Sequence, residues 1–382
     1  MDFRFSDEQR QFQESLERFL RKDYGFERRR EIARSDAGYS TEVWAQFAEM
    51  GVLALTLPEA HDGFGGGAFD TLLVMEALGR ANAVEPYLST VVLGASLIAQ
   101  AGSDAQRGEI LPAVAAGTCK LALAHGEAGN RYELEAISTT AKTDGDGYVL
   151  NGAKAQVLHG GAADRLLVSA RTRGSAREAG GISLFLVDAK APGLACFSYP
   201  TQDGQRAANL TFQDVRVPKA ALVGPEHGAL PLIEAAMDRA IAALCAEAVG
   251  NMAALIEATV GYLKTRKQFG VPIGSFQALQ HRAVDMYLHA EQARSMAYLA
   301  AARVDGDDAA ARRHAVSAAK VLVGQSARFV GQQAVQLHGG IGVTEELAVS
   351  HYFKRLTMIT LAFGDIDHHL DRVGRASLAA AA

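Results

Sequence analysis

The spacing of apolar residues changes twice along this chain, and those two changes restrict its fold more than any other feature. Up to about residue 118 the apolar side chains recur three and four residues apart, which is the spacing of α-helices. From Cys119 the pattern breaks into short apolar runs bounded by turn residues, and from Leu230 the helical spacing returns. The sequence therefore predicts an α+β fold with an N-terminal helical domain (1–118), a middle β domain (119–226) and a C-terminal helical domain (227–382).

The first domain is predicted to be all helical. Ser6 and Gln9 have the spacing of a capping box, in which a hydroxyl and an amide each satisfy a backbone N–H where a helix begins. Further helical patterns cover residues 41–50, 69–79 and 90–100.

The middle domain is predicted to be an antiparallel β-barrel or β-sandwich. Its strand-like runs are residues 120–124, 136–142, 148–151, 166–170, 182–187 and 209–212. No helix-length pattern lies between these runs, whereas parallel strands need long crossover connections. Antiparallel pairing is therefore favoured.

The last domain is predicted to be a helical bundle of the four-helix type. Long helical patterns cover residues 230–266, 276–303 and 308–337, and they are rich in alanine, which favours helix formation. Gly270 and Pro272 separate the first two patterns, and such short connections make neighbouring helices antiparallel.

Composition narrows the classes of function. Of 382 residues, 49% are apolar and 21% charged, and 38 Lys and Arg against 43 Asp and Glu give a net charge of −5. A slightly acidic chain without a Lys/Arg block is not expected to bind nucleic acid. No apolar run reaches the length of about 20 residues that predicts a membrane span, and the acidic N-terminus is unlike a signal peptide. Three scattered cysteines do not form a disulfide framework, so we expect a cytoplasmic protein.

The sequence offers no convincing covalent nucleophile or metal site. His368 and His369 are adjacent, so on a helix their side chains diverge, and no HExxH or GxSxG pattern occurs. Residues 63–68 fit the text of a dinucleotide-binding GxGxxA motif, but no second strand ending in an acid follows at the required distance. We interpret them as a tight glycine turn between helices. The chemistry is then expected to depend on an organic cofactor.

Two segments of the last domain contain residues that can hold a phosphorylated cofactor. Arg266 and Phe269 lie where the first long helix ends, and a guanidinium can bind a phosphate while an aromatic ring packs on a planar base. Gln336 precedes Gly339 and Gly340, and bare glycines let a diphosphate approach backbone N–H groups. Each segment alone also fits an ordinary helix end, which favours cations or a terminating glycine.

Taken in order, these motifs resemble the acyl-CoA dehydrogenase family. The matching segments are 57–67 (LPEAHDGFGGG), 148–152 (YVLNG), 214–218 (DVRVP), 266–270 (RKQFG), 272–277 (PIGSFQ) and 336–342 (QLHGGIG). The predicted helical–β–helical order is also similar to that family. Within it, residues 332–342, 352–359 and 362–369 make the chain most similar to the small subunits of pimeloyl-CoA dehydrogenases.

The resemblance implies a flavoprotein of fatty acid metabolism that oxidises an acyl-CoA thioester to the 2,3-enoyl-CoA. In the family a carboxylate removes the α proton, the β hydride passes to the flavin, and FAD lies between subunits. Carried over by motif, the residues that would hold its pyrophosphate and adenine are Arg266, Phe269, Gln277, Gln336, Gly339 and Gly340. The resemblance further implies a medium-chain dicarboxylyl-CoA such as pimeloyl-CoA as substrate and an electron-transfer flavoprotein as acceptor. It also implies a homotetramer, or a heterotetramer with a larger subunit.

The half of the site that would contact the flavin ring departs from the family. Residues 124–129 read Ala-His-Gly-Glu-Ala-Gly where the family has a Thr-Glu-Pro type of loop, and residues 156–158 read Gln-Val-Leu where an aromatic and a hydroxyl are usual. Phe363 stands at about the position of the family's catalytic glutamate. The candidate bases are therefore Asp365, two residues further on, and Asp238, at a position where some relatives carry the base before an arginine.

These departures leave two hypotheses within the family. In one, the chain is the small subunit of a two-subunit dehydrogenase, and a larger partner holds the flavin ring and the base. In the other, it forms a homotetramer with an unusual flavin bed. We favour the first because the ring contacts and the base motif have diverged together. Outside these stand a non-catalytic FAD-supporting or assembly subunit, a flavin monooxygenase of the same architecture, and a nicotinamide enzyme built on residues 63–68.

Overall fold

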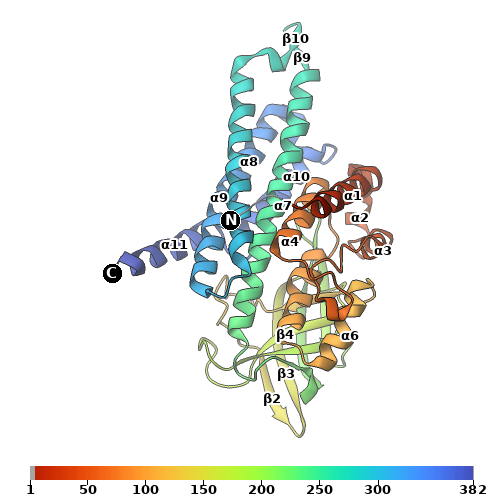
Figure 1. The fold of residues 1–382 in the computed structure, drawn as a ribbon, viewed down its shortest axis with the longest axis vertical. Coiled ribbons are helices and arrows are strands. Elements are labelled where there is room, and N and C mark those ends of the chain that lie inside the picture. Colours follow the sequence, from red (N-terminus) through yellow and green to blue (C-terminus); the bar gives the residue numbers. More distant parts are fainter. Residues whose placement is uncertain (1–4, 382) are drawn as a thin grey trace. The chain divides into compact units, whose positions relative to one another are not determined.

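The computed structural model describes residues 5–381 and the side chains of residues 5–378. Along the chain, helices come first, then strands, then helices again, so the predicted α+β class is confirmed (Figure 1). Contacts divide the chain into two compact units. One unit comprises the residues up to Glu31 together with 68–83 and 241–382, and the other comprises 32–67 and 84–240. The three domain limits drawn from the sequence stay a prediction.

A mostly antiparallel sheet forms the centre of the second unit. Its strands are β1 Leu121–Ala124, β2 Thr140–Asp144, β3 Gly147–Leu158, β4 Arg165–Arg171, β5 Ile182–Asp188, β6 Leu194–Pro200, β7 Arg206–Pro218 and β8 Leu222–Val223. They lie in the order β6-β7-β3-β2-β4-β5-β8, with β1 beside β4. The β1–β4 pair is parallel, as is a one-residue contact of β2 with β4. Tyr148, Phe185 and Phe212 pack in the core of this sheet.

Two strand predictions need correction. Residues 136–139 are not part of a strand, because the backbone N–H groups of Ser138 and Thr139 donate to the Glu127 carboxylate, at 2.7 and 3.0 Å, rather than to a neighbouring strand. The sequence pattern also fails to predict β6. This strand lies at one end of the sheet and most of its side chains are exposed, so no inward-facing apolar alternation marks it.

The helices before the sheet cover most of the first 118 residues. They are α1 Asp7–Asp23, α2 Phe26–Arg34, α3 Thr41–Glu49, η1 Glu59–His61, α4 Ala68–Ala81, the π-helical η2 Leu88–Ala95, α5 Ser96–Ala101 and α6 Asp104–Ala115. Ser6 and Gln9 form the predicted capping box at the start of α1. The predicted helix 90–100 is a π-helical segment followed by a short α-helix.

Residues 63–67 form a turn that uses its own backbone donors. Gly65 N–H donates to the Leu57 carbonyl at 2.8 Å, and Gly66 N–H donates to the Leu55 carbonyl at 2.9 Å. A Cβ at Gly63 would overlap the Leu57 carbonyl, so only glycine fits there. These N–H groups therefore hold the turn together instead of facing a phosphate.

The elements after the sheet form the helical bundle. They are α7 Leu230–Thr265, the hairpin strands β9 Lys267–Gln268 and β10 Val271–Pro272, η4 Ile273–Ser275, α8 Gln277–Val304, α9 Ala309–His338, η5 Gly339–Val343, α10 Ala348–Leu361 and α11 Ile366–Ala381. The short helix η3 Lys219–Ala221 lies before them, between β7 and β8. In the first unit α8 and α4 pack together, and α9 packs on α8, α10 and α11. The β9–β10 hairpin joins the end of α7 to the start of α8 (Figure 1).

No apolar run in the chain reaches about 20 residues, but the charged residues within α7 are few enough for this helix to resemble a membrane span. By length and composition alone this helix meets the criterion, with a mean hydropathy of 1.5 over 18 residues. In the structure 78% of that window is buried inside the protein, which is how the core helix of a folded bundle behaves. The apolar composition of α7 is explained by the alanine, leucine and isoleucine side chains that pack in the protein interior.

Candidate functional site

The first candidate site lies at the end of the bundle where α7 meets the β9–β10 hairpin. Arg266 follows α7, and its backbone is fixed on both sides, by its own N–H to the Tyr262 carbonyl and by the Ile273 N–H to its carbonyl, each at 2.8 Å. Its side chain is exposed. Phe269 at the hairpin tip has a φ of 53° and is 92% exposed, and its ring meets the edge of Phe276 at 6.0 Å. The backbone is thus held while the guanidinium and the ring stay open to a ligand.

The glycine corner at the end of α9 is equally open. Gln336 is exposed in the last turn of α9, and Gly339 follows the helix with a φ of 64°. A Cβ built on Gly339 or Gly340 would meet no described atom within 4 Å. The corner therefore offers bare backbone to an approaching group.

Ring stacking places the glycine corner beside the end of α7. The His338 ring stacks on Tyr262 at 4.5 Å with planes 28° apart, and Tyr262 is one helical turn before Arg266. His338 donates from Nδ1 to the Ala334 carbonyl at 2.8 Å, and burial lowers its pKa, so the ring is neutral. The start of α8 joins the same end, because Arg282 donates to the Gln333 amide oxygen at 3.2 Å.

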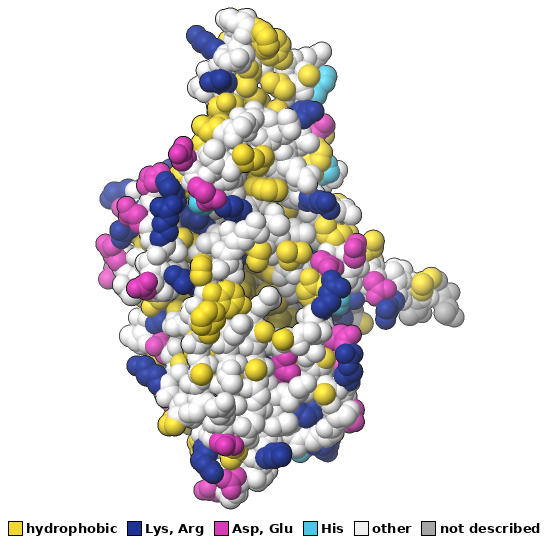
Figure 2. Space-filling model, turned by 180° about the vertical axis from the view of Figure 1, so that it is seen from behind, with side chains coloured by type: hydrophobic (Ala, Val, Ile, Leu, Met, Phe, Trp, Pro, Cys, Tyr) yellow, Lys and Arg dark blue, Asp and Glu magenta, His cyan; other side chains and the backbone are white. Residues whose placement is uncertain are grey.

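The structure thus gathers the six predicted cofactor residues at one end of the bundle. Gln277 is the exposed first residue of α8 in this group. Figure 2 shows hydrophobic and basic side chains together at this end of the bundle, which is uppermost in the view. A guanidinium, an exposed phenyl ring and two bare glycines suit the phosphates and the planar base of a dinucleotide.

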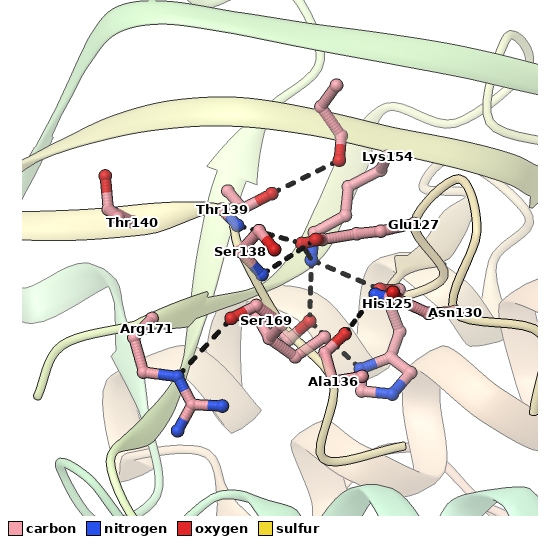
Figure 3. Close-up of polar contacts among 12 residues, drawn as sticks. His125, Glu127, Asn130, Ala136, Ser138, Thr139, Thr140, Lys154, Ser169 and Arg171 are labelled. Carbon is pink, nitrogen blue, oxygen red and sulfur yellow. Dashed lines mark hydrogen bonds and ion pairs between the residues drawn. The ribbon is translucent and has the colours of Figure 1, made fainter. Parts of the chain in front are cut away.

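The second candidate site is a buried ion pair in the second compact unit, which contains the sheet and is called the β unit below. The ammonium of Lys154, on β3, donates to the Glu127 carboxylate at 2.7 Å, to the His125 carbonyl at 3.1 Å and to the Ser169 hydroxyl at 3.1 Å (Figure 3). The side chain of Lys154 is completely buried and that of Glu127 is 7% exposed. All three N–H groups of the ammonium are therefore used.

The charges in this cluster depend on one another. Burial lowers the pKa of Lys154 to about 8, although the Glu127 carboxylate raises it. Burial raises the pKa of Glu127, but the Lys154 ammonium and the hydrogen bonds to its oxygens outweigh this and lower it. Burial, and then the Lys154 charge, lower the pKa of His125 to about 3, so this ring is neutral. Its Nδ1 lies 3.0 Å from the Ser169 hydroxyl.

Sequence reasoning missed Lys154. The signal was available, because Lys154 has the same parity along β3 as the buried Tyr148 and Leu150 and so faces inward. The cluster anchors the loop from His125 to Thr139, which is one of the segments that depart from the expected pattern. The other segment contains a bulge: the register of β3 and β7 shifts between Lys154 and Val157, and the exposed Gln156 there has a φ of 55°.

The two candidate bases lie in different surroundings. Asp238 is 3% exposed in the part of α7 that belongs to the second unit. Asp365, in the first unit, is partly exposed, and its carboxylate accepts the backbone N–H of His368 at 2.9 Å where α11 begins. Phe363, at the expected position of a glutamate, has a φ of 56°. The base assignments stay a prediction.

Comparison with known proteins covers almost the whole chain. The model of the acyl-CoA dehydrogenase N-terminal domain matches residues 6–118, that of the middle domain matches 122–215, and that of the C-terminal domain matches 230–378. The "Probable acyl-CoA dehydrogenase YngJ" of Bacillus subtilis is 29% identical over 369 residues, which is 95% of this chain and 96% of that protein.

Solved structures are similar over the same extent. A chain of the ChsE4–ChsE5 complex from Mycobacterium tuberculosis is 28% identical with a TM-score of 0.88, and the match covers 99% of each chain. A chain of the FAD complex of PigA is 27% identical with a TM-score of 0.90, and the match covers 100% of each chain.

Proposed function

The chain belongs to the acyl-CoA dehydrogenase family, and from that premise we propose that it is the small subunit of a two-subunit dehydrogenase. It is a flavoprotein oxidoreductase that uses FAD and dehydrogenates an acyl-CoA. In the proposed assembly this chain contributes Arg266 and the glycine corner, and a larger subunit contributes the flavin bed and the base. The relation to pimeloyl-CoA dehydrogenase small subunits is part of the same proposal.

The observation that carries this proposal is the open bundle end. Phe269 is 92% exposed and Gly339 and Gly340 face open space, as expected of a surface that is completed by a cofactor shared with another subunit. Phe363 in place of a glutamate supports a base on the partner. ChsE4–ChsE5, a similar structure, is a complex of two differently named chains, which supports a heteromeric arrangement for this chain as well.

The residues of the bundle end have separate roles in this proposal. FAD, when bound, supplies the ring that accepts the hydride. Arg266 binds the pyrophosphate with its guanidinium, and Gly339 and Gly340 bring backbone N–H groups to the same phosphates. Phe269 packs on the adenine, and the amides of Gln277 and Gln336 orient the cofactor through hydrogen bonds. If this chain itself supplies the base, Asp238 or Asp365 takes the α proton.

The finer points of substrate, acceptor and location are also proposals. A medium-chain dicarboxylyl-CoA, such as pimeloyl-CoA, is the proposed substrate, and an electron-transfer flavoprotein is the proposed acceptor. The cytoplasm is the proposed compartment, because Cys119, Cys196 and Cys245 are all free thiols, as is usual in a reducing environment.

The subunit proposal is tested by purifying the chain alone and after co-expression with candidate larger acyl-CoA dehydrogenase subunits. We expect enoyl-CoA formation only from the pair, assayed with a panel of mono- and dicarboxylyl-CoA substrates. A yellow chain with stoichiometric FAD that turns over by itself would overturn the two-subunit proposal. In that case Asp238→Asn and Asp365→Asn are assayed separately, and wild-type turnover in both would exclude them as bases. Oxygen consumption without enoyl product would indicate a monooxygenase instead.

The cofactor role of the bundle end is tested by the affinity for FAD. Arg266→Met is expected to weaken FAD binding to the pair about tenfold or more, because a charge-assisted bond to phosphate is lost. Arg303→Met, at an exposed position near the end of α8, serves as the control and is expected to bind FAD like the wild type. Equal FAD affinity in both variants would contradict the assignment of Arg266.

A further inference from the structure

Lys320, in the middle of α9, is buried with its ammonium against backbone oxygens of a neighbouring turn. Its side-chain nitrogen lies 2.6 Å from the carbonyl of Ile359, 3.2 Å from that of Thr360, 2.8 Å from that of Ala362 and 3.1 Å from that of Gly364. The residue is 1% exposed. These carbonyls end α10 and form the turn to α11. A cation at this place complements the C-terminal dipole of α10.

A histidine binds the one carbonyl between Ala362 and Gly364. Nε2 of His369, which is fully buried, lies 3.1 Å from the Phe363 carbonyl, and its Nδ1 lies 3.2 Å from the Ser317 hydroxyl. Since a carbonyl only accepts, Nε2 carries the proton and Nδ1 accepts from Ser317. Ser317 and Lys320 are three residues apart and share one face of α9. This group, Ser317, Lys320 and His369, is called the α9 clamp below.

The turn that the clamp holds has little freedom of its own. Gly364 has a φ of 120°, and a Cβ there would overlap the imidazoles of His368 and His369. Phe363 has a φ of 56°, a region that bulky residues avoid. Strained backbone persists only where the surroundings hold it, and here the clamp does so.

We propose that the α9 clamp is a positioning device that fixes the turn of residues 362–365, and with it Asp365 as the group that takes the α proton from the substrate. This inference rests on the form of the proposed function in which this chain, rather than its partner, supplies the base from Asp365. Lys320 touches neither substrate nor cofactor in this role and acts only through the backbone it binds.

The clamp depends on the charge of Lys320. An ammonium has three N–H groups to share among four carbonyls, whereas a neutral amine has two and loses its attraction to the helix end. Burial lowers the pKa of Lys320 to about 8, while Cys245 on α7 and Asp365 on the turn raise it. The clamp is therefore complete below about pH 8 and weakens as the pH rises through that value.

Cys245 and His369 keep their charge state in this range, and the other titratable groups that face the clamp are Asp365 on the turn and His368 and Arg372 on α11. Burial raises the pKa of the Cys245 thiol to about 12, so it stays neutral. Burial, with the charges of Lys320 and Arg372, lowers the pKa of His369 to about 3, so this ring stays neutral too. Asp365 faces Lys320 from the turn, and Arg372 faces His369 from α11.

Hydrogen exchange tests the clamp without substrate or cofactor. In the isolated chain, exchange of the peptide 359–369, corrected for its intrinsic pH dependence, is expected to rise about tenfold between about pH 7 and about pH 9.5. Lys320→Met should show the faster exchange already at the lower pH. Lys22→Met, an exposed lysine on α1, is the control and should match the wild type. Wild-type exchange in Lys320→Met would overturn the proposal.

The pH dependence of turnover tests the link to catalysis. In the complete enzyme, kcat should fall above about pH 8, and Lys320→Arg, whose guanidinium stays charged, should move that alkaline limb upward by about one pH unit or more. Lys320→Met should lower kcat about tenfold or more with little change in KM, since a misplaced turn costs reaction rate rather than binding. An alkaline limb unchanged in Lys320→Arg would overturn the positioning role.

The two arms separate the possible failures. If the wild-type complex has no dehydrogenase activity, the proposed function fails, while the exchange arm still decides whether the clamp holds the turn. Should Lys320→Met not fold, His369→Asn removes the imidazole bonds to the Phe363 carbonyl and the Ser317 hydroxyl, leaves Lys320 in place, and should raise exchange in the same peptide. Unchanged exchange in that variant would count against the clamp.

Discussion

The neutral histidine at the buried ion pair makes the β unit sensitive to acid, and its contribution can be calculated. Burial next to Lys154 lowers the pKa of His125 from 6.5 to about 3. The unfolded chain therefore takes up a proton as the pH falls below about 6.5, but the folded chain does not until about pH 3. The folded state therefore has its full stability at a pH above the pKa of His125 in the unfolded chain. The free energy of unfolding decreases as the pH falls from that value toward the pKa of His125 in the folded chain.

The size of the loss follows from the two pKa values. At pH 5 the pH lies about 1.5 units below the pKa of His125 in the unfolded chain, and each unit corresponds to about 1.4 kcal/mol. The free energy of unfolding is therefore about 2 kcal/mol lower at pH 5 than at pH 8. That is a substantial part of the total stability of a typical domain, about 5–15 kcal/mol.

The single tryptophan allows the free energy of unfolding to be measured for the compact unit that contains His125. Trp44 is buried in the same compact unit as His125, so its fluorescence during urea unfolding reports on that unit. His125→Asn keeps a polar group beside Ser169 but cannot titrate, and it should lose most of the 2 kcal/mol difference between about pH 8 and about pH 5. His61→Asn, at a partly exposed site in that unit, is the control. An acid-induced loss as large in His125→Asn as in the wild type would refute the reasoning.

Three further predictions follow from local contacts. Gly364→Ala should lower the free energy of unfolding by about 1–3 kcal/mol, because the new Cβ overlaps buried imidazoles at a φ of 120°, whereas the open Gly374 should accept alanine without loss in a thermal melt. The Arg355 guanidinium binds the buried Glu247 carboxylate at 2.5 and 2.7 Å, so Arg355→Met leaves that carboxylate without its partner. The free energy of unfolding, measured in urea, should fall by about 3–5 kcal/mol. Adding Glu247→Gln should restore part of this stability, and no restoration would contradict the pairing argument. Cys196 is the exposed thiol and the other two cysteines are buried, so a thiol reagent should label one site in the folded chain and three after denaturation.

The long helices could be predicted from the sequence because their pattern repeats over many turns. The predicted pattern 276–303 is α8 Gln277–Val304, and 308–337 is α9 Ala309–His338. Ser6 and Gln9 could be predicted for another reason, since a capping box acts within four residues. Strand limits depend on partners far away in the chain. The pattern of residues 136–139 is strand-like, but the Glu127 carboxylate accepts the N–H groups of Ser138 and Thr139, and the N–H groups of Ala136 and Ile137 donate to other loop carbonyls.

The candidate site divides in the same way. Arg266 and the glycine corner could be proposed from the sequence because each motif is contiguous. For Lys154 and Lys320 the sequence indicates at most an inward position, because only the fold shows which carboxylates and carbonyls surround each ammonium. Both lysines occupy inward positions of their elements, and a lysine at such a position indicates a buried acceptor that binds its ammonium.

The exposed ring of Phe269 makes the newly synthesised chain prone to associate with other proteins before a partner covers that ring. Covering a phenyl ring that is 92% exposed is worth about 2–3 kcal/mol to any apolar surface that does so. A newly made copy without its mate offers this ring to chaperones and to other unassembled copies alike. In the proposed two-subunit enzyme, balanced synthesis of the two subunits would protect this chain from loss by aggregation, and surplus copies would be the first that quality control removes.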